Sequence, residues 1–196
     1  MISNRDLVEK TKPVLKDSYL QVFACLLLAS ALPQIVLSLS PTNVILNIII
    51  LCISAYIQVG IALYCLEIYK GKEAGLEMIF SRFNGLKPII FMLIYTLIVL
   101  LGLILFVVPG IILGLMYSQI FFILADDPDV GVNEAFNMSN QMMKNNKWQL
   151  FMLNLEALLY FIAGVFTLFI WWVWLFPRYS VAYAGFYEEV KKEFKG

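Results

Sequence analysis

The chain has 196 residues, of which 61% are hydrophobic and 14% are charged, whereas soluble domains average about 45–50% and about 25%. It contains no histidine, which removes the most common general base and metal ligand. Its formal net charge is zero, so we expect no electrostatic attraction to nucleic acid.

The first predicted element is a helix over residues 3–17 that lies on the cytoplasmic membrane surface. Ser3 and Asp6 resemble a capping box at its start. Leu7, Thr11 and Leu15 recur at helical spacing, while the lysines of this segment fall on other faces. This distribution is typical of a helix at the water–bilayer boundary.

Three long segments beyond this helix are almost free of charge. Residues 18–66 and 88–125 contain no Asp, Glu, Lys or Arg, and residues 148–187 contain only Glu156 and Arg178. A helix crosses a bilayer in about 20 residues, so each segment is long enough for two crossings.

Helix-breaking residues lie near the middle of each segment: SPTN at 40–43, Pro109-Gly110, and a softer region at 164–167. The pattern predicts an all-α membrane protein with six transmembrane helices as three hairpins, forming a single integral membrane domain over residues 1–196. The predicted spans are 19–40, 44–68, 88–108, 111–125, 148–165 and 168–187. Short amphipathic cytoplasmic helices are predicted over 73–83 and 131–144.

The fourth predicted span is short. Its 15 residues, 111–125, rise about 22 Å against a hydrocarbon core of about 30 Å. Two alternatives follow: spans 3 and 4 form a re-entrant hairpin, or both cross where the bilayer is thin.

The basic residues indicate the orientation of the hairpins. Every lysine and arginine except Arg178 lies outside the six predicted spans, in segments that hairpin topology brings to one side. Because basic residues are retained in the cytoplasm, both termini are predicted to be cytoplasmic.

Polar residues within the second span suggest two interpretations. Asn47 and Gln58, with Glu67 at the span's end, could line a polar path. The alternatives are hydrogen bonding between helices for the two amides and a solvated carboxylate at the boundary for Glu67.

The sequence ADDPD carries the densest group of carboxylates, Asp126, Asp127 and Asp129. Such carboxylates could hold Mg²⁺ against a lipid phosphate, but the sequence offers no second acidic cluster to complete a site. Asp-Pro also begins turns, and Gly131 with Glu134 begins the next helix. We therefore expect a turn and a helix start here, and no metal.

Glu156 and Arg178 are the charged residues inside the predicted membrane region. By residue rise they lie about 12 Å and about 14 Å from the cytoplasmic side, on neighbouring antiparallel helices. An isolated charge at this depth is unfavourable, so the sequence predicts an intramembrane ion pair between them, with either a structural or a transport role.

From about residue 60 onward the chain resembles the DUF975 family of uncharacterised bacterial integral membrane proteins. The resemblance rests on FSRFNGLK, on LGLILFVVPGIILGLMYSQIFFILADDPDVGVNEAFNMSNQMMKNNKWQLFML, and on FPRYSVAYAGFYEEV. It implies a multi-pass protein of the bacterial cytoplasmic membrane and no known activity. The family usually has other residues where this chain has Glu156 and Arg178, which implies that the pair is peculiar to this member.

Three functions follow as hypotheses. We favour a non-enzymatic protein, without catalytic residues or cofactors, that binds a membrane protein partner or a second copy of itself and supports a transport, export or stress system. The alternative is a small-solute or ion transporter or channel that uses Glu156 and Arg178. The third is a lipid-phosphate enzyme that uses Asp126, Asp127 and Asp129.

Overall fold

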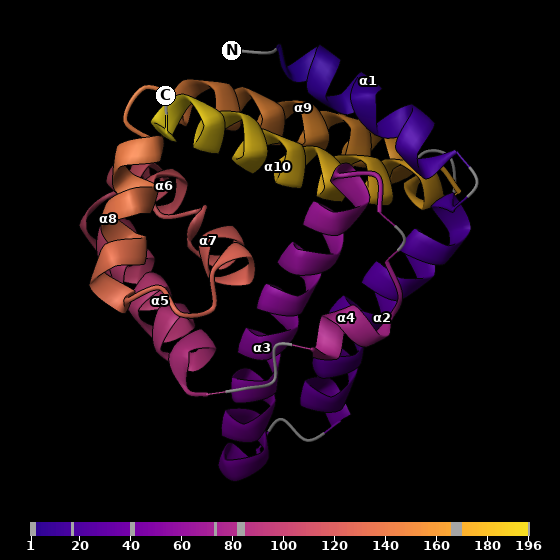
Figure 1. The fold of residues 1–196 in the computed structure, drawn as a ribbon. Helices are drawn as coiled ribbons and strands as arrows, with labels where there is room; N and C mark the ends of the chain where they lie inside the picture. Colours follow the sequence, from indigo (N-terminus) through magenta and orange to yellow (C-terminus); the bar gives the residue numbers. More distant parts are fainter. Residues whose placement is uncertain are drawn as a thin grey trace.

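A computed structural model of the protein describes residues 3–16, 18–39, 42–72, 74–81, 85–165 and 170–195. The described residues form helices and connecting turns, with no strand among them (Figure 1). The helices are α1 (Asn4–Leu15), α2 (Tyr19–Leu39), α3 (Val44–Tyr69), α4 (Glu77–Phe80), α5 (Lys87–Leu105), α6 (Val107–Met116), α7 (Ile120–Asp126), α8 (Val132–Met142), α9 (Lys147–Val165) and α10 (Trp172–Lys195).

Five stretches of the described chain are helical, long and apolar enough to cross a membrane. They are Tyr19–Ser38, Val44–Tyr69, Lys87–Leu105, Val107–Asp126 and Lys147–Val165. They correspond to the first five predicted spans, so the all-helical membrane class is confirmed. The sixth predicted span is not among them, because α10 begins only at Trp172, contains Pro177 and Arg178 in its first half, and ends in a charged stretch. Its predicted turn lies partly outside the described residues, at 166–169.

The predicted break at Pro109-Gly110 is wrong. Both residues lie inside α6, and the chain turns at Phe106, whose φ of −165° and ψ of 152° are extended. Proline is tolerated there because it sits in the first turn of α6, where backbone N–H groups have no partner within the helix. The fourth span is consequently longer than predicted, and it is divided into α6 and α7.

Small residues allow α5 and α6 to pack closely. A Cβ atom built on Gly102 would lie 2.9 Å from the Cα of Gly110, and one built on Gly110 would lie 2.8 Å from the backbone nitrogen of Leu103. A Cβ built on Gly114 would meet only ordinary contacts, 3.8 Å or more away. Of the PGIILG glycines, Gly110 is therefore the one that the helix contact requires.

Helices are present in the three segments predicted to lie on the membrane surface, with shifted ends. In α1, the Ser3 hydroxyl accepts a hydrogen bond from the Asp6 backbone N–H at 3.2 Å, as a helix N-cap does. Its buried face packs against α10 and α9, which lie side by side (Figure 1). Helix α4 is shorter than the predicted segment 73–83, of which residues 73, 82 and 83 lie outside the described chain. Helix α8 matches the predicted segment 131–144.

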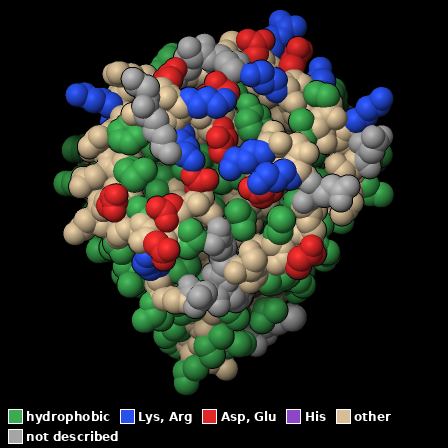
Figure 2. Space-filling view, in the orientation of Figure 1, with side chains coloured by type: hydrophobic (Ala, Val, Ile, Leu, Met, Phe, Trp, Pro, Cys, Tyr) green, Lys and Arg blue, Asp and Glu red, His purple; other side chains and the backbone are tan. Residues whose placement is uncertain are grey.

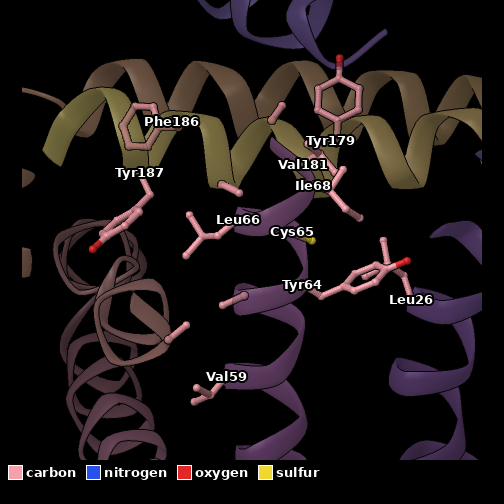
Figure 3. Close-up of a cluster of buried hydrophobic side chains, with 14 of the residues drawn as sticks. Leu26, Val59, Tyr64, Cys65, Leu66, Ile68, Tyr179, Val181, Phe186 and Tyr187 are labelled. Atoms are coloured by element: carbon pink, nitrogen blue, oxygen red, sulfur yellow. The ribbon is translucent and has the colours of Figure 1, made fainter. Parts of the chain in front are cut away.

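The core is centred on α3, which packs against α2, α4, α5, α7 and α10. Figure 3 shows its side chains Tyr64, Cys65 and Leu66 between Leu26 of α2 and Tyr187 of α10. These residues are all at most 2% exposed. This packing positions the C-terminal end of α3 next to the C-terminal half of α10.

The surface divides by chemistry. In the face shown in Figure 2, charged side chains occupy the upper and middle parts, while the lower tip is almost entirely hydrophobic. That tip is where α2 ends and α3 begins (Figure 1); Ile35, Val44 and Ile45 are 52%, 68% and 73% exposed there. Such a continuous apolar surface is unfavourable in water and suits contact with lipid.

Candidate functional site

Five charged residues meet where α3, α7 and α10 end or pass close to one another. We call this group the ionic cluster; it comprises Glu67, Lys70, Asp126, Glu188 and Lys191. The Nζ of Lys70 lies 3.2 Å from Glu188 Oε1, 3.6 Å from Asp126 Oδ1 and 3.8 Å from Glu67 Oε1. Lys191 pairs with the other oxygen of Asp126, to which the Tyr187 hydroxyl also donates at 3.4 Å. The cluster therefore connects three helices that are far apart in sequence.

The environment of Lys70 favours its charged form. Burial alone would lower its pKa, but the hydrogen bond and charge of Glu188, followed by the charges of Asp126 and Glu67, outweigh burial and raise the pKa. A raised folded-state pKa contributes stability that is fully present below the ordinary lysine value of about 10.4 and lost as the pH rises through the raised value. The contribution is therefore constant across neutral pH.

The ADDPD residues have two different roles. Asp126 belongs to the ionic cluster, whereas the Asp127 carboxylate accepts a hydrogen bond from the backbone N–H of Asp129 at 3.0 Å, as aspartates in turns do. The chain then enters α8 at Gly131, as the sequence predicted. Within the described residues, no group of three or more cysteine, aspartate or glutamate side chains is placed to hold a metal ion.

The three polar residues predicted along the second span do not form one path. Asn47 lies in the first turns of α3, at the end of the molecule opposite the ionic cluster, to which Glu67 belongs. Gln58 lies between them and lines a separate hollow of about 270 Å³, described next.

This hollow lies beside the break between α6 and α7, and we call it the broken-span hollow. Its polar lining comes from three helices and the break itself: Gln58, Ser118, Gln119, Asn154, Ser180 and Tyr183. Gln119 is 2% exposed, and its buried Oε1 has no hydrogen-bond partner, while its Nε2 donates to the Ser118 hydroxyl at 2.8 Å. The hollow can thus offer a hydrogen-bond acceptor to a small polar molecule.

Hydroxyl groups stabilise the break itself. The Ser118 hydroxyl donates to the Leu115 carbonyl at 2.8 Å, and the buried Ser139 hydroxyl of α8 donates to the Met116 carbonyl at 2.9 Å. Interrupted helices persist in membranes only where other groups satisfy the freed backbone. This break was not predicted, and its signal in the sequence is the Tyr-Ser-Gln triplet within an apolar run.

Glu156 and Arg178 face the same space but do not pair directly. Both line a second hollow of about 560 Å³ between α1 and the α9–α10 pair, which we call the α1 hollow. The ion pairs among the described residues do not include one between them. Glu156 instead accepts a hydrogen bond from the Tyr179 hydroxyl at 3.1 Å, and the buried Nε of Arg178 has no partner. The two side chains thus border one hollow, and no salt bridge joins them in the described part of the chain.

Comparison with known proteins yields one match. A family described as "Protein of unknown function (DUF975)" matches residues 4–193, which is nearly the whole chain. No curated protein and no solved structure matches it.

Proposed function

For a chain that belongs to the DUF975 family, we propose a non-enzymatic function in the bacterial cytoplasmic membrane, where the protein binds a partner of a transport, export or stress system. The observation that carries this proposal is the outer face of α8. The inner face of this helix is buried and consists of Ala135, Ser139 and Met142. The outer face exposes four amides, namely Asn133, Asn137, Asn140 and Gln141.

These amides are available for contacts with another protein. Within the part of the chain that the structure describes, no side-chain hydrogen bond involves them, whereas the Ser139 hydroxyl holds α8 against α6. A rigid helix with free hydrogen-bonding groups and little charge suits a protein interface, where hydrogen bonds recur across the contact area. It is a poor surface for lipid chains, which cannot hydrogen-bond.

A photoreactive amino acid at position 137 tests this docking in cells. We expect a cross-linked product of defined mass at Asn137 and none at Leu100, an exposed apolar position of α5 that serves as the control. Replacing Asn137 and Gln141 together by lysine should reduce co-purification of that product in mild detergent roughly tenfold, because interface energy concentrates in few contacts. Two differently tagged copies identify a homo-oligomer. A monodisperse monomer without cross-links at position 137 would contradict docking.

The transport alternative receives less support. It requires a polar cavity that joins Glu156 and Arg178 with Asn47 and Gln58. Glu156 and Arg178 line the α1 hollow, while Gln58 lines the broken-span hollow. Asn47 lies far along α3 from both, near the α2–α3 turn.

The proposal includes a sixth span formed by the first half of α10, with both termini cytoplasmic. What supports it is that both ends of the chain pack onto the same part of the molecule. The Asn4 side chain donates to the Gln149 carbonyl at 3.0 Å, and Lys191 joins the ionic cluster at the ends of α3 and α7. With only five crossings, the two termini would face opposite compartments.

Accessibility labelling tests this topology. Single substitutions Lys12→Cys and Lys192→Cys, in a background with Cys25, Cys52 and Cys65 replaced by alanine, place a thiol on α1 and on α10 at exposed positions. A membrane-impermeant maleimide should label both in inverted vesicles and neither in intact spheroplasts. Labelling of the Lys192→Cys variant from outside the cell would contradict six spans.

A further inference from the structure

The α1 hollow has the size and the lining of a small-molecule site. Its volume of about 560 Å³ falls within the range of about 300–1,000 Å³ typical of such sites. Cationic, anionic and aromatic side chains all contribute to its lining, so a matching ligand carries more than one kind of chemical group.

The position of α1 locates the hollow relative to the bilayer. Helix α1 carries five charged residues, and the side chains of Arg5 and Lys12 are 88% and 54% exposed. Such a helix is strongly disfavoured in hydrocarbon, so it lies at the water–bilayer boundary. The hollow beneath it therefore opens toward that boundary, within reach of lipid headgroups.

Three basic and two acidic side chains line the hollow, and they fall into two groups. On α1, Glu9 is shared between Arg5 at 3.9 Å and Lys12 at 3.6 Å. On α9 and α10, Glu156 and Arg178 remain as one carboxylate and one guanidinium that face the same space without pairing. A purely anionic ligand would be repelled by Glu156, and a purely cationic ligand would be repelled by Arg178. A ligand with both charges matches both groups.

We propose that the α1 hollow binds the zwitterionic headgroup of an aminophospholipid. The phosphate lies against Arg178, whose planar guanidinium forms paired hydrogen bonds with phosphate oxygens. The ammonium group lies against Glu156 and the rings of Tyr160 and Trp171, which also line the hollow and attract cations through their faces. The headgroup thereby bridges two opposite charges that the protein alone leaves apart.

Native mass spectrometry of protein released from vesicles of equimolar phosphatidylethanolamine and phosphatidylglycerol tests the proposal. The unmodified protein should retain phosphatidylethanolamine roughly tenfold over phosphatidylglycerol, as expected for one additional charge-assisted contact. Glu156→Gln should abolish this preference while lipid retention persists. Arg178→Gln should reduce retention of both lipids. Lys192→Gln, an exposed change in the ion pair with Glu189 at the C-terminal end of α10, should behave like the unmodified protein.

Soluble competitors separate the sources of the phosphate. Glycerophosphoethanolamine should displace the lipid, and inorganic phosphate at the same concentration should not. Equal retention of the two lipids by the unmodified protein, an unchanged preference in Glu156→Gln, or displacement by inorganic phosphate would each overturn the proposal. If Arg178→Gln does not fold, Arg178→Lys keeps the charge without the paired geometry and should still weaken retention. The test is independent of docking at α8, because neither α8 nor its amides line this hollow.

Discussion

Replacement of Asp126 by asparagine is expected to lower the free energy of unfolding by about 2–3 kcal/mol, toward the lower end of the loss seen when one partner of a buried ion pair is removed. Asp126 is the shared counter-ion of Lys70 and Lys191, and its side chain is 22% exposed. Without the Asp126 charge, the partly buried ammonium groups of Lys70 and Lys191 lose a shared carboxylate partner. Denaturant or thermal unfolding in detergent micelles measures the effect.

Asp129→Asn is the matched control, because Asp129 is exposed and belongs to the same turn but to no ion pair among the described residues. We expect a change within about 0.5 kcal/mol for it. Combining Asp126→Asn with Lys191→Met should destabilise the protein by less than the sum of the two single changes, because the residues interact directly.

Equal effects of Asp126→Asn and Asp129→Asn on the free energy of unfolding would contradict the structural role of the ionic cluster. Full cellular function of both variants would exclude the lipid-phosphate enzyme hypothesis.

Gly60→Ala is expected to cost about 2–3 kcal/mol and to separate α4 from α3, as overpacking in a core does. A Cβ at position 60 would lie 1.8 Å from the Ile79 carbonyl oxygen and 2.5 Å from its carbonyl carbon. These are backbone atoms, so no side-chain rotation can relieve the contact. Ile79, which is fully buried, would have to leave its position.

Gly114→Ala provides the comparison for this change. It adds the same methyl group within a membrane helix but meets only ordinary contacts, and alanine also favours helix over glycine by about 1 kcal/mol. We therefore expect it to be neutral or stabilising in the same unfolding assay. Limited proteolysis between α3 and α5 should become faster in Gly60→Ala only. Equal proteolysis rates in the two variants would mean that α4 does not depend on this contact.

The features predicted well from sequence are those decided by local chemistry. An uncharged run such as residues 18–66 can be identified without knowing which helices pack against it. The hydrocarbon core of the bilayer requires a long apolar segment whatever its neighbours are. The N-cap at Ser3 also depends on residues within one turn. Pro109 was misjudged because the effect of proline depends on its position in the helix, and the sequence did not reveal that α6 begins at Val107.

The features that were missed depend on which helices become neighbours. Lys70, Asp126 and Glu188 are far apart in sequence, and each taken alone is an ordinary charge next to a span. Their pairing follows from the packing of α10 and α7 against α3. Glu156 and Arg178 lie on adjacent helices, as the sequence suggested, but α1, from the other end of the sequence, contributes to the hollow that they line.

The contacts made by the two ends of the chain determine when the protein can finish folding. Asn4 bonds to a residue 145 positions later, and Lys191 to one 65 positions earlier. During synthesis, α1 and α3 emerge long before α9 and α10. The buried face of α1 therefore lacks its packing partners until these last helices are made, and Lys70 and Asp126 lack Glu188 and Lys191. Contacts of such long sequence separation form slowly, and exposed surface in the interval promotes misassembly. The period before α10 is complete is thus when this protein is most vulnerable to aggregation and proteolysis.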